Sequence, residues 1–167
     1  MTISVVMPVY NERKTIKEIL SKVRAVKMKK EIIIVDDFST DGTRSILKEY
    51  TNQDDIIILL NEKNLGKGAS IRRGFATAKN DVVIVQDADL EYDPEEYEKL
   101  VRPIEKGLAD VVYGSRFLYG ERRVLYAQVD ELGAGQGNDG GERVDGVFGW
   151  PAKAWLATAP GHGRGVL

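Results

Sequence analysis

The stretch "VVIVQDADLEYD" (residues 82–93) begins with an unbroken apolar run and ends with a series of carboxylates. Residues 82–86 predict a buried strand, because a strand that is covered on both faces is apolar throughout rather than alternating. The carboxylates that follow are Asp87, Asp89, Glu91 and Asp93. Carboxylates repel one another and are costly to desolvate, so their concentration at a strand end needs a structural or chemical reason.

The same pattern of an apolar strand followed by a helix recurs along residues 1 to about 120. Strands are predicted at 3–9, 32–35, 56–60, 82–86 and 110–114. Helices are predicted at 13–26, within "TDGTRSILKEY" (40–50), at 68–79, and from Pro94 to Gly107. Unbroken apolar strands that alternate with helices indicate a mostly parallel sheet covered on both faces, which is a doubly wound α/β fold.

Some of the carboxylates have a purely structural interpretation. Asp93 can cap the helix that Pro94 begins, and Glu96 completes the spacing of a capping box. Gly107 can end this helix. Asp41 is a second candidate cap, because carboxylates after a strand often accept hydrogen bonds from a helix start or a turn.

The composition limits the classes of function. The chain has 167 residues, 24 basic and 26 acidic side chains and a formal net charge of -2, so the whole chain is not attracted to nucleic acid. It has no Cys and one His, which excludes thiolate sites, Cys nucleophiles and multi-His metal sites. No apolar run is long enough for a membrane span, and the N-terminus does not resemble a signal peptide. We expect a soluble, cytoplasmic protein.

The last quarter of the chain differs from the rest. Residues 127–167 contain 10 of the 17 glycines, and neither strand alternation nor a helical face persists there. Ordering glycine costs the most backbone entropy, so we expect residues 125–167 to be a disordered or loosely packed tail. The predicted domain is therefore residues 1–124.

Polar residues gather at the predicted strand ends. In open α/β sheets, ligands bind outside the carboxyl ends of the strands. The segments that would meet there are "PVYNE" (8–12), Asp36–Asp37, "NEKNLGKGAS" (61–70), "QDADLEYD" (86–93) and "YGSRF" (113–117). Helix caps or solvated turns explain some of these residues equally well, so the role of Asp36–Asp37 stays open.

A cation site is one interpretation of the fourth strand end. In an extended chain, residues two apart point the same way, so Asp87, Asp89 and Glu91 could face one point. Mg²⁺ or Mn²⁺ accepts oxygen ligands in such an arrangement. Because Mg²⁺ usually takes only one or two protein carboxylates and completes its shell with phosphates, a phosphorylated substrate is expected.

The segment "NLGKGASIRRG" (64–74) has residues suited to binding the phosphate groups of such a substrate. Gly66 and Gly68 allow a close backbone approach, Lys67 adds positive charge, and the following helix offers its amides to an anion. The segment matches neither the P-loop nor the dinucleotide fingerprint. An ordinary loop with a solvated basic helix face is the alternative. Arg116 is a further phosphate or sugar candidate, and a surface ion pair is its alternative.

These motifs, in this order and spacing, resemble family 2 glycosyltransferases. The segments are "SVVMPVYNERKTI", "EIIIVDDFSTDGT", "NEKNLGKGASIRRGF", "DVVIVQDADLEYDPEEYEKLV" and "ADVVYGSRF". They are most similar to the branch of dolichyl-phosphate (polyprenyl-phosphate) mannosyl- and glucosyltransferases. The resemblance covers residues 2–124 and implies a nucleotide-diphospho-sugar transferase (GT-A-like) fold. We expect this fold to be incomplete, because no acceptor half is recognisable after about residue 125.

The resemblance also implies roles for individual residues. Pro8, Tyr10 and Glu12 would line a base pocket, and Val35 and Asp37 would contact the base or ribose. Asp87, Ala88 and Asp89 match the DxD segment, with Asp89 and Glu91 on the metal and diphosphate. Lys67 and Gly68 would lie near the donor. Arg116 would approach its phosphate or sugar and, with Asp89, act in catalysis.

The activity so implied is inverting sugar transfer from GDP-mannose or UDP-glucose, with Mg²⁺ or Mn²⁺, to a polyprenyl phosphate. Such an acceptor would place the protein peripherally at the cytoplasmic membrane face. One alternative is a truncated, non-catalytic nucleotide-sugar-binding module. Another is a signalling receiver domain, since "IIIVDD" (32–37) resembles a receiver strand end. In receivers, however, the acidic pair follows the first strand, and here it follows the second.

Overall fold

The computed structural model describes residues 1–109, 111–115, 123–129, 135–137, 143–144 and 155–158. The chain divides into two compact units, Met1–Glu95 and Glu96–Leu167, and each is described by itself.

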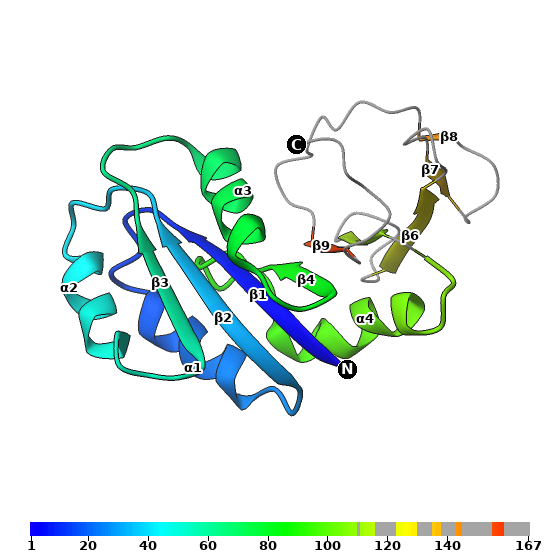
Figure 1. Ribbon diagram of the computed structural model, residues 1–167, viewed down its shortest axis with the longest axis horizontal. Helices are drawn as coiled ribbons and strands as arrows, with labels where there is room; N and C mark the ends of the chain where they lie inside the picture. Colours follow the sequence, from blue (N-terminus) through cyan, green and yellow to red (C-terminus); the bar gives the residue numbers. More distant parts are fainter. Residues whose placement is uncertain (110, 116–122, 130–134, 138–142, 145–154, 159–167) are drawn as a thin grey trace. The chain divides into compact units, whose positions relative to one another are not determined.

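The first unit contains a parallel sheet with the strand order β3-β2-β1-β4 (Figure 1). Its strands are β1 (Thr2–Val9), β2 (Lys29–Asp36), β3 (Ile56–Leu60) and β4 (Val82–Val85). Its helices are α1 (Ile16–Ala25), α2 (Thr43–Leu47), the 3₁₀ turn η1 (Lys48–Tyr50) and α3 (Lys67–Thr77). The predicted parallel α/β sheet is confirmed.

The strand order reverses at β1, since β2 and β3 lie on one side of it and β4 lies on the other. Val6 of β1 is in register with Ile33 of β2 and with Val85 of β4. The switch point of the strand order therefore lies between β1 and β4. Such a switch point is where open α/β sheets bind ligands.

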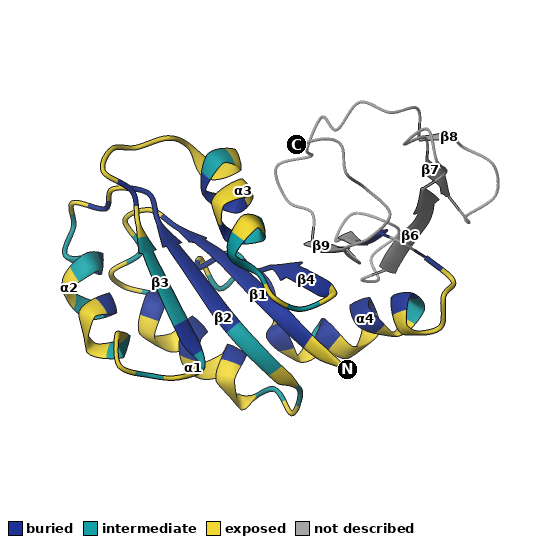
Figure 2. Ribbon diagram, in the orientation of Figure 1, coloured by how far each residue is buried: buried dark blue, intermediate teal, exposed yellow. Residues whose placement is uncertain are grey.

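The strands of this sheet are largely buried (Figure 2), and their buried residues are mostly apolar. One face packs against α3 in a hydrophobic cluster. Its residues are Val6, Ile33, Val35, Ile57, Leu59, Phe75, Ala78 and Val83. Residues one position along each strand point to the opposite face. Val5, Met7 and Ile34 of that face are fully buried. The helix α1, which lies behind the sheet in Figure 1, has four fully buried apolar side chains of its own.

Helix α3 lies unusually close to β1. A Cβ atom added to Gly74 would be 2.3 Å from Cγ1 of Val6, so the absence of a side chain at this position allows the contact. Gly74 is therefore a packing residue rather than a flexible one.

The second unit begins near the 3₁₀ turn η2 (Pro94–Glu96) and contains α4 (Tyr97–Glu105). Oδ1 of Asp93 accepts a hydrogen bond from the amide of Glu95 (3.1 Å) in η2. The helix α4 itself begins three residues later than predicted, after Glu96 and without a side-chain cap, so the predicted capping box of Asp93 and Glu96 is wrong. Gly107 follows α4 with a left-handed φ of 65°, as expected for a residue that ends a helix.

The remaining strands of the second unit pair in antiparallel fashion, in the order β9-β5-β6-β7-β8. They are β5 (Val111–Ser115), β6 (Arg123–Val129), β7 (Gly135–Gly137), β8 (Arg143–Val144) and β9 (Trp155–Thr158). The sequence did not predict strands after residue 125. Strand pairing uses backbone groups, so a glycine-rich segment can pair without apolar alternation. The boundary at residue 124 stays a prediction.

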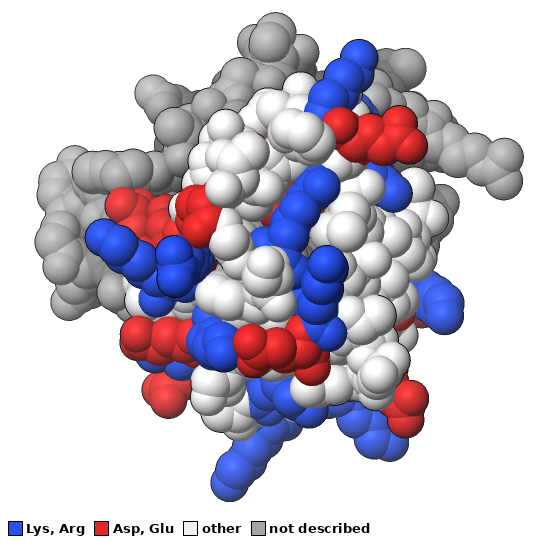
Figure 3. Space-filling model, turned by 90° about the vertical axis from the view of Figure 1, so that its left-hand side faces the viewer, with Lys and Arg blue, Asp and Glu red and all other residues white. Residues whose placement is uncertain are grey.

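The surface of the described part is mixed in charge. On the face shown in Figure 3, basic and acidic side chains lie beside one another, and neither sign forms a continuous patch. Among the described helices, none combines the length and the apolarity that a membrane crossing requires.

Candidate functional site

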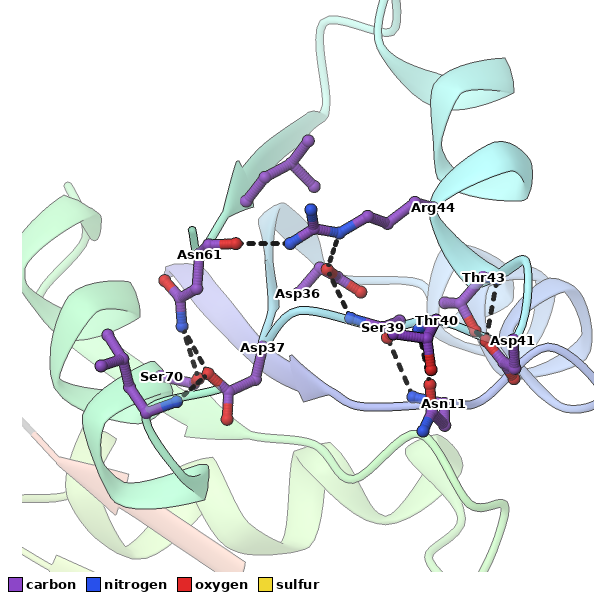
Figure 4. Close-up of polar contacts among 12 residues, drawn as sticks. Asn11, Asp36, Asp37, Ser39, Thr40, Asp41, Thr43, Arg44, Asn61 and Ser70 are labelled. Atoms are coloured by element: carbon purple, nitrogen blue, oxygen red, sulfur yellow. Dashed lines mark hydrogen bonds and ion pairs between the residues drawn. The ribbon is translucent and has the colours of Figure 1, made fainter. Parts of the chain in front are cut away.

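Hydrogen bonds join the loops after β1 and β2 at the carboxyl edge (Figure 4). The amide of Asn11 donates to Oγ of Ser39 (2.9 Å), and the amide of Thr40 donates to Oδ1 of Asn11 (2.8 Å). The amide of Arg13 donates to Oδ2 of Asp41 (3.0 Å). The two loops therefore form one connected rim.

Asp41 also caps α2, as the sequence suggested. Its Oδ1 accepts hydrogen bonds from the amide (3.0 Å) and the hydroxyl (2.6 Å) of Thr43, the first residue of α2. Burial acts to raise the pKa of Asp41, but the hydrogen bonds from Thr43 and Arg13 outweigh it and lower the pKa. The role of Asp41 is to hold the rim together.

Asp36 is fully buried and forms an ion pair with Arg44 of α2. Arg44 also donates to the backbone carbonyl of Asn61, and its guanidinium lies 5.0 Å from the centroid of the Phe38 ring. Oδ2 of Asp36 accepts the amide of Ser39 (3.1 Å), whereas Oδ1 has no hydrogen-bond partner among the described residues. This pair ties the end of β2 to α2.

Asp37 is 3 % exposed and is surrounded by donors. Its Oδ1 accepts from the amide of Leu65 (2.8 Å) and from Nδ2 of Asn61 (2.8 Å), and its Oδ2 accepts from the amide of Gly66 (2.7 Å). Burial acts to raise the pKa of Asp37, but these hydrogen bonds outweigh it and lower the pKa. The carboxylate fixes the loop before α3, and its predicted contact with a base or ribose stays a prediction.

Asn61, directly after β3, is a residue that the sequence did not single out. It is 3 % exposed, and besides its bond to Asp37 it donates to Oγ of Ser70 (3.2 Å) and accepts from Arg73. Its amide donates to the carbonyl of Asp36 (2.8 Å). Its position as the first polar residue after an apolar strand is the signal that could have identified it.

Lys67 and Asp87, two predicted site residues from different elements, form a close ion pair. Nζ of Lys67, the first residue of α3, lies 2.7 Å from Oδ1 and 2.8 Å from Oδ2 of Asp87, which follows β4. The side chain of Asp87 is 16 % exposed and that of Lys67 is 53 % exposed. A cation therefore already contacts both oxygens of this carboxylate.

The segment after Asp87 does not have the extended geometry expected from the sequence. Residues 88–90 form a turn, Leu90 has a left-handed φ of 65°, and the amide of Glu91 donates to Oδ1 of Asp89 (3.0 Å). A turn breaks the alternation of side chains, so the argument that residues two apart face one point is wrong here. Within the described residues, no three acidic or His side chains group closely enough to hold a metal ion. Asp89 and Glu91 are both exposed.

The structure places the other predicted residues as follows. Pro8 and Val35 are buried partners in the β1–β2 register, and the Val35 side chain belongs to the core against α3. Tyr10 is 50 % exposed. Oε2 of Glu12 accepts from the hydroxyl of Thr15 (2.6 Å) at the start of α1. Ala88 is buried, Gly68 is exposed in the first turn of α3, and Arg116 lies outside the described residues.

The described non-glycine residues with a positive φ are Asn11 (57°), Phe38 (67°) and Leu90 (65°). Each lies in the loop that follows a parallel strand, after β1, β2 and β4 respectively. Left-handed backbone is costly for bulky side chains, and such outliers cluster at functional sites. The strain independently points to the carboxyl edge as the site.

Comparison with known proteins identifies the family of this chain. The sequence profile described as Glycosyl transferase family 2 matches residues 4–155, which extends past residue 124. A dolichol-phosphate mannosyltransferase of Pyrococcus furiosus is 36 % identical over 72 % of this chain and 34 % of its own length. An undecaprenyl-phosphate 4-deoxy-4-formamido-L-arabinose transferase of Pseudomonas fluorescens is 41 % identical over 66 % of this chain and 34 % of its own length.

Solved structures give the same fold. Residues 1–349 of TarS from S. aureus in complex with UDP-GlcNAc match with a TM-score of 0.58 and 29 % identity, over 66 % of this chain and 33 % of theirs. The mannosyltransferase PcManGT of Pyrobaculum calidifontis, in complex with GDP-Man and Mn²⁺, matches with a TM-score of 0.51 and 25 % identity, over 56 % of this chain and 29 % of its own.

The predicted GT-A-like fold is thereby confirmed. The chain spans about a third of the length of the curated relatives that it matches. The family profile nevertheless covers most of this chain, and it includes every strand end that forms the rim. The chain belongs to glycosyl transferase family 2.

Proposed function

We propose that this protein binds a nucleoside-diphosphate sugar at the carboxyl edge of its parallel sheet and transfers the sugar, with inversion, to a polyprenyl phosphate. The observation that supports this most directly is the Lys67–Asp87 pair at the switch point, where the chain places an acidic residue and a cationic one at 2.7 Å. A diphosphate and a divalent cation need this combination of charges.

The carboxylates after β4 fit a divalent cation if the diphosphate of the sugar donor supplies the other ligands. The carboxylate of Asp87 already holds a cationic group on both oxygens, and Asp89 is exposed on the turn that follows, so it would join Asp87 at one cation through a movement of that turn. Two carboxylates with diphosphate oxygens are a usual ligand set for Mg²⁺ or Mn²⁺. A bound cation would stabilise the charge that develops on the leaving nucleotide. Glu91 is proposed as a further ligand through a rearrangement of the turn at 88–90.

The base side of the donor is assigned to the rim after β1. The half-exposed ring of Tyr10 is available for stacking, while Pro8 and Val35 are buried register partners in the strands that precede the rim. Asp37 and Glu12 act by fixing neighbouring loops. Arg116 is proposed to contact the donor's phosphate or sugar, as the family resemblance implies.

A phosphate acceptor suits this site chemically. A phosphate oxygen is already anionic, so it needs little help from a general base when it attacks the anomeric carbon. The relatives' names specify dolichol phosphate and undecaprenyl phosphate, and solved neighbours hold UDP-GlcNAc or GDP-Man. We propose a polyprenyl phosphate acceptor, a GDP- or UDP-linked donor, and peripheral attachment at the cytoplasmic membrane face.

Calorimetry with GDP and with UDP, each with Mn²⁺, tests donor binding. One nucleotide should bind the wild type, and Asp89→Asn should weaken that binding by about tenfold or more, the loss typical of one charged contact. The control is Asp54→Asn, because Asp54 is exposed and outside the rim. Equal losses in both variants would refute the assignment of Asp89.

Transfer is tested separately, with labelled GDP-mannose and UDP-glucose and vesicles that contain a polyprenyl phosphate. Label in the lipid fraction supports the proposed reaction. Donor binding without any transfer would reject the reaction and favour the non-catalytic nucleotide-sugar-binding module.

A further inference from the structure

We propose that Lys67 is an internal competitor for the divalent cation: in the donor-free protein its ammonium occupies the cation position on Asp87, and it leaves when a diphosphate binds. This inference rests on the proposed function and adds a mechanism by which the site stays closed to metal until the donor arrives.

The contact geometry supports competition rather than a chance surface pair. The ammonium lies within 2.8 Å of both oxygens of Asp87, so a divalent cation that approaches either oxygen meets a positive charge beside it. Two cations on one carboxylate would also repel each other strongly, since charges a few ångströms apart interact by about 4 kcal/mol at an intermediate effective dielectric constant. Asp87 therefore binds a metal less favourably while Lys67 stays on it, and the two cations compete for this carboxylate.

The loop that presents Lys67 is fixed in place. The amides of Leu65 and Gly66 donate to the buried Asp37 at 2.8 and 2.7 Å, and α3 begins at Lys67. Gly66 has a φ of 86°, which a side chain would make strained. The Cα of Lys67 is thus anchored, and only its flexible stem needs to move.

The ammonium is also free to leave. Its side chain is 53 % exposed, whereas that of Asp87 is 16 % exposed. Rotation of the four-carbon stem can bring the ammonium onto a diphosphate bound beside Asp87, which gives Lys67 a new anionic partner. Asp87 then becomes available to the metal. Metal and nucleotide would therefore strengthen each other's binding, and this coupling is reciprocal.

The test is the affinity for Mn²⁺ alone, measured by calorimetry on three proteins. They are the wild type, Lys67→Gln, and the control Lys63→Gln, which removes an exposed positive charge from the same loop. Lys63 forms no ion pair within the described residues, so its removal reports the general electrostatic effect. Lys67→Gln should bind Mn²⁺ alone at least about fivefold more tightly than wild type, the lower end of typical coupling factors. Lys63→Gln should change the affinity by less than about twofold.

A second measurement concerns the coupling itself. In the wild type, GDP or UDP should tighten Mn²⁺ binding by a larger factor than in Lys67→Gln. Thermal melting of each variant checks that it is folded, and Lys67→Arg should retain the low affinity for Mn²⁺ alone because it keeps a cation at the site. Equal Mn²⁺ affinities in wild type, Lys67→Gln and Lys63→Gln would overturn the inference, as would equal gains in the two Gln variants.

Failure of the inference is distinguishable from failure of the proposed function. If neither nucleotide binds any of the three folded proteins in the presence of Mn²⁺, the proposed donor site is wrong, and the inference falls with it. If a nucleotide binds with Mn²⁺ but Lys67→Gln leaves the affinity for Mn²⁺ alone unchanged, the donor site stands and the competition is refuted.

Discussion

Asp36 and Asp37 are neighbours in the chain, yet their carboxylates stabilise different connections of the sheet (Figure 4). Asp36 pairs with Arg44 of α2, and Asp37 accepts the amides of Leu65 and Gly66 before α3. Asp36 is the last residue of β2 and Asp37 is the first residue of the loop after it, so the two carboxylates reach different neighbours. The pair therefore fixes the rim from two directions.

Replacement of Arg44 by Met should destabilise the protein by about 3–5 kcal/mol, because it leaves the fully buried Asp36 without its cation. Chemical denaturation measures this free energy. The double variant Asp36→Asn with Arg44→Met should recover part of the loss, since no charge is then buried. Strictly additive losses would show that the two side chains do not interact.

Replacement of Asp37 by Asn should lower the free energy of unfolding by about 1–3 kcal/mol at pH 7. The two carboxylate oxygens of Asp37 accept three hydrogen bonds, and in Asn one of these oxygens is replaced by an NH₂ group that can only donate. The control is Asp54→Asn, an exposed site that should change stability by less than about 0.5 kcal/mol.

Acid should erase the difference between wild type and Asp37→Asn. The pKa of Asp37 is lowered in the folded protein from its ordinary value of 3.8. A lowered folded pKa contributes stability above the unfolded pKa and loses it as the pH falls through the folded pKa. The two unfolding curves should therefore stay apart above pH 3.8 and converge below it. A gap that stays constant to the lowest accessible pH would contradict the assignment.

Two glycines of α3 should respond to alanine in opposite ways. Gly74→Ala should destabilise by about 1–3 kcal/mol, because its Cβ would lie 2.3 Å from Val6. Gly68→Ala should stabilise by up to about 1 kcal/mol, since its nearest neighbour is 3.8 Å away and alanine favours a helix. Thermal melting of the two variants decides this, and equal shifts of Tm would refute the close packing of α3 on β1.

Tyr10→Ala should weaken binding of the nucleoside diphosphate by about 5- to 150-fold, the range for loss of one stacked aromatic ring. Stability should change little, because the ring is 50 % exposed. Phe38→Asn is the matched control. It removes the other exposed ring of this rim, and Asn tolerates the left-handed backbone. Equal losses of nucleotide affinity in the two variants would show that the base does not stack on Tyr10 in particular.

Local patterns predicted the sheet well. The predicted strand at 56–60 coincides with β3, and residues 82–86 contain β4 (Val82–Val85). The helix predicted at 13–26 is shorter: α1 begins at Ile16, after a turn in which the amides of Thr15 and Ile16 donate to the carbonyl of Glu12. Apolar runs and helix periodicity are local signals, so they specify elements and leave their ends uncertain.

The contacts of the site were much harder to predict. Asp37 is fixed by amides 28 and 29 positions away, and Asp87 by an ammonium 20 positions away. Such pairs depend on how the loops fold over the sheet edge. The sequence did not predict the turn at Leu90, because leucine rarely adopts a left-handed φ and is not a typical turn residue.

The left-handed Phe38 and Leu90 have a consequence for protein engineering. A glycine or asparagine at either position would relieve backbone strain, so a screen for thermal tolerance should recover such variants at this rim sooner than in the sheet. At Leu90 such a variant would also change how the turn at 88–90 presents Asp89. If Asp89 binds the donor as proposed, selection for heat resistance alone would weaken donor binding, so a screen of this protein needs a binding readout in parallel.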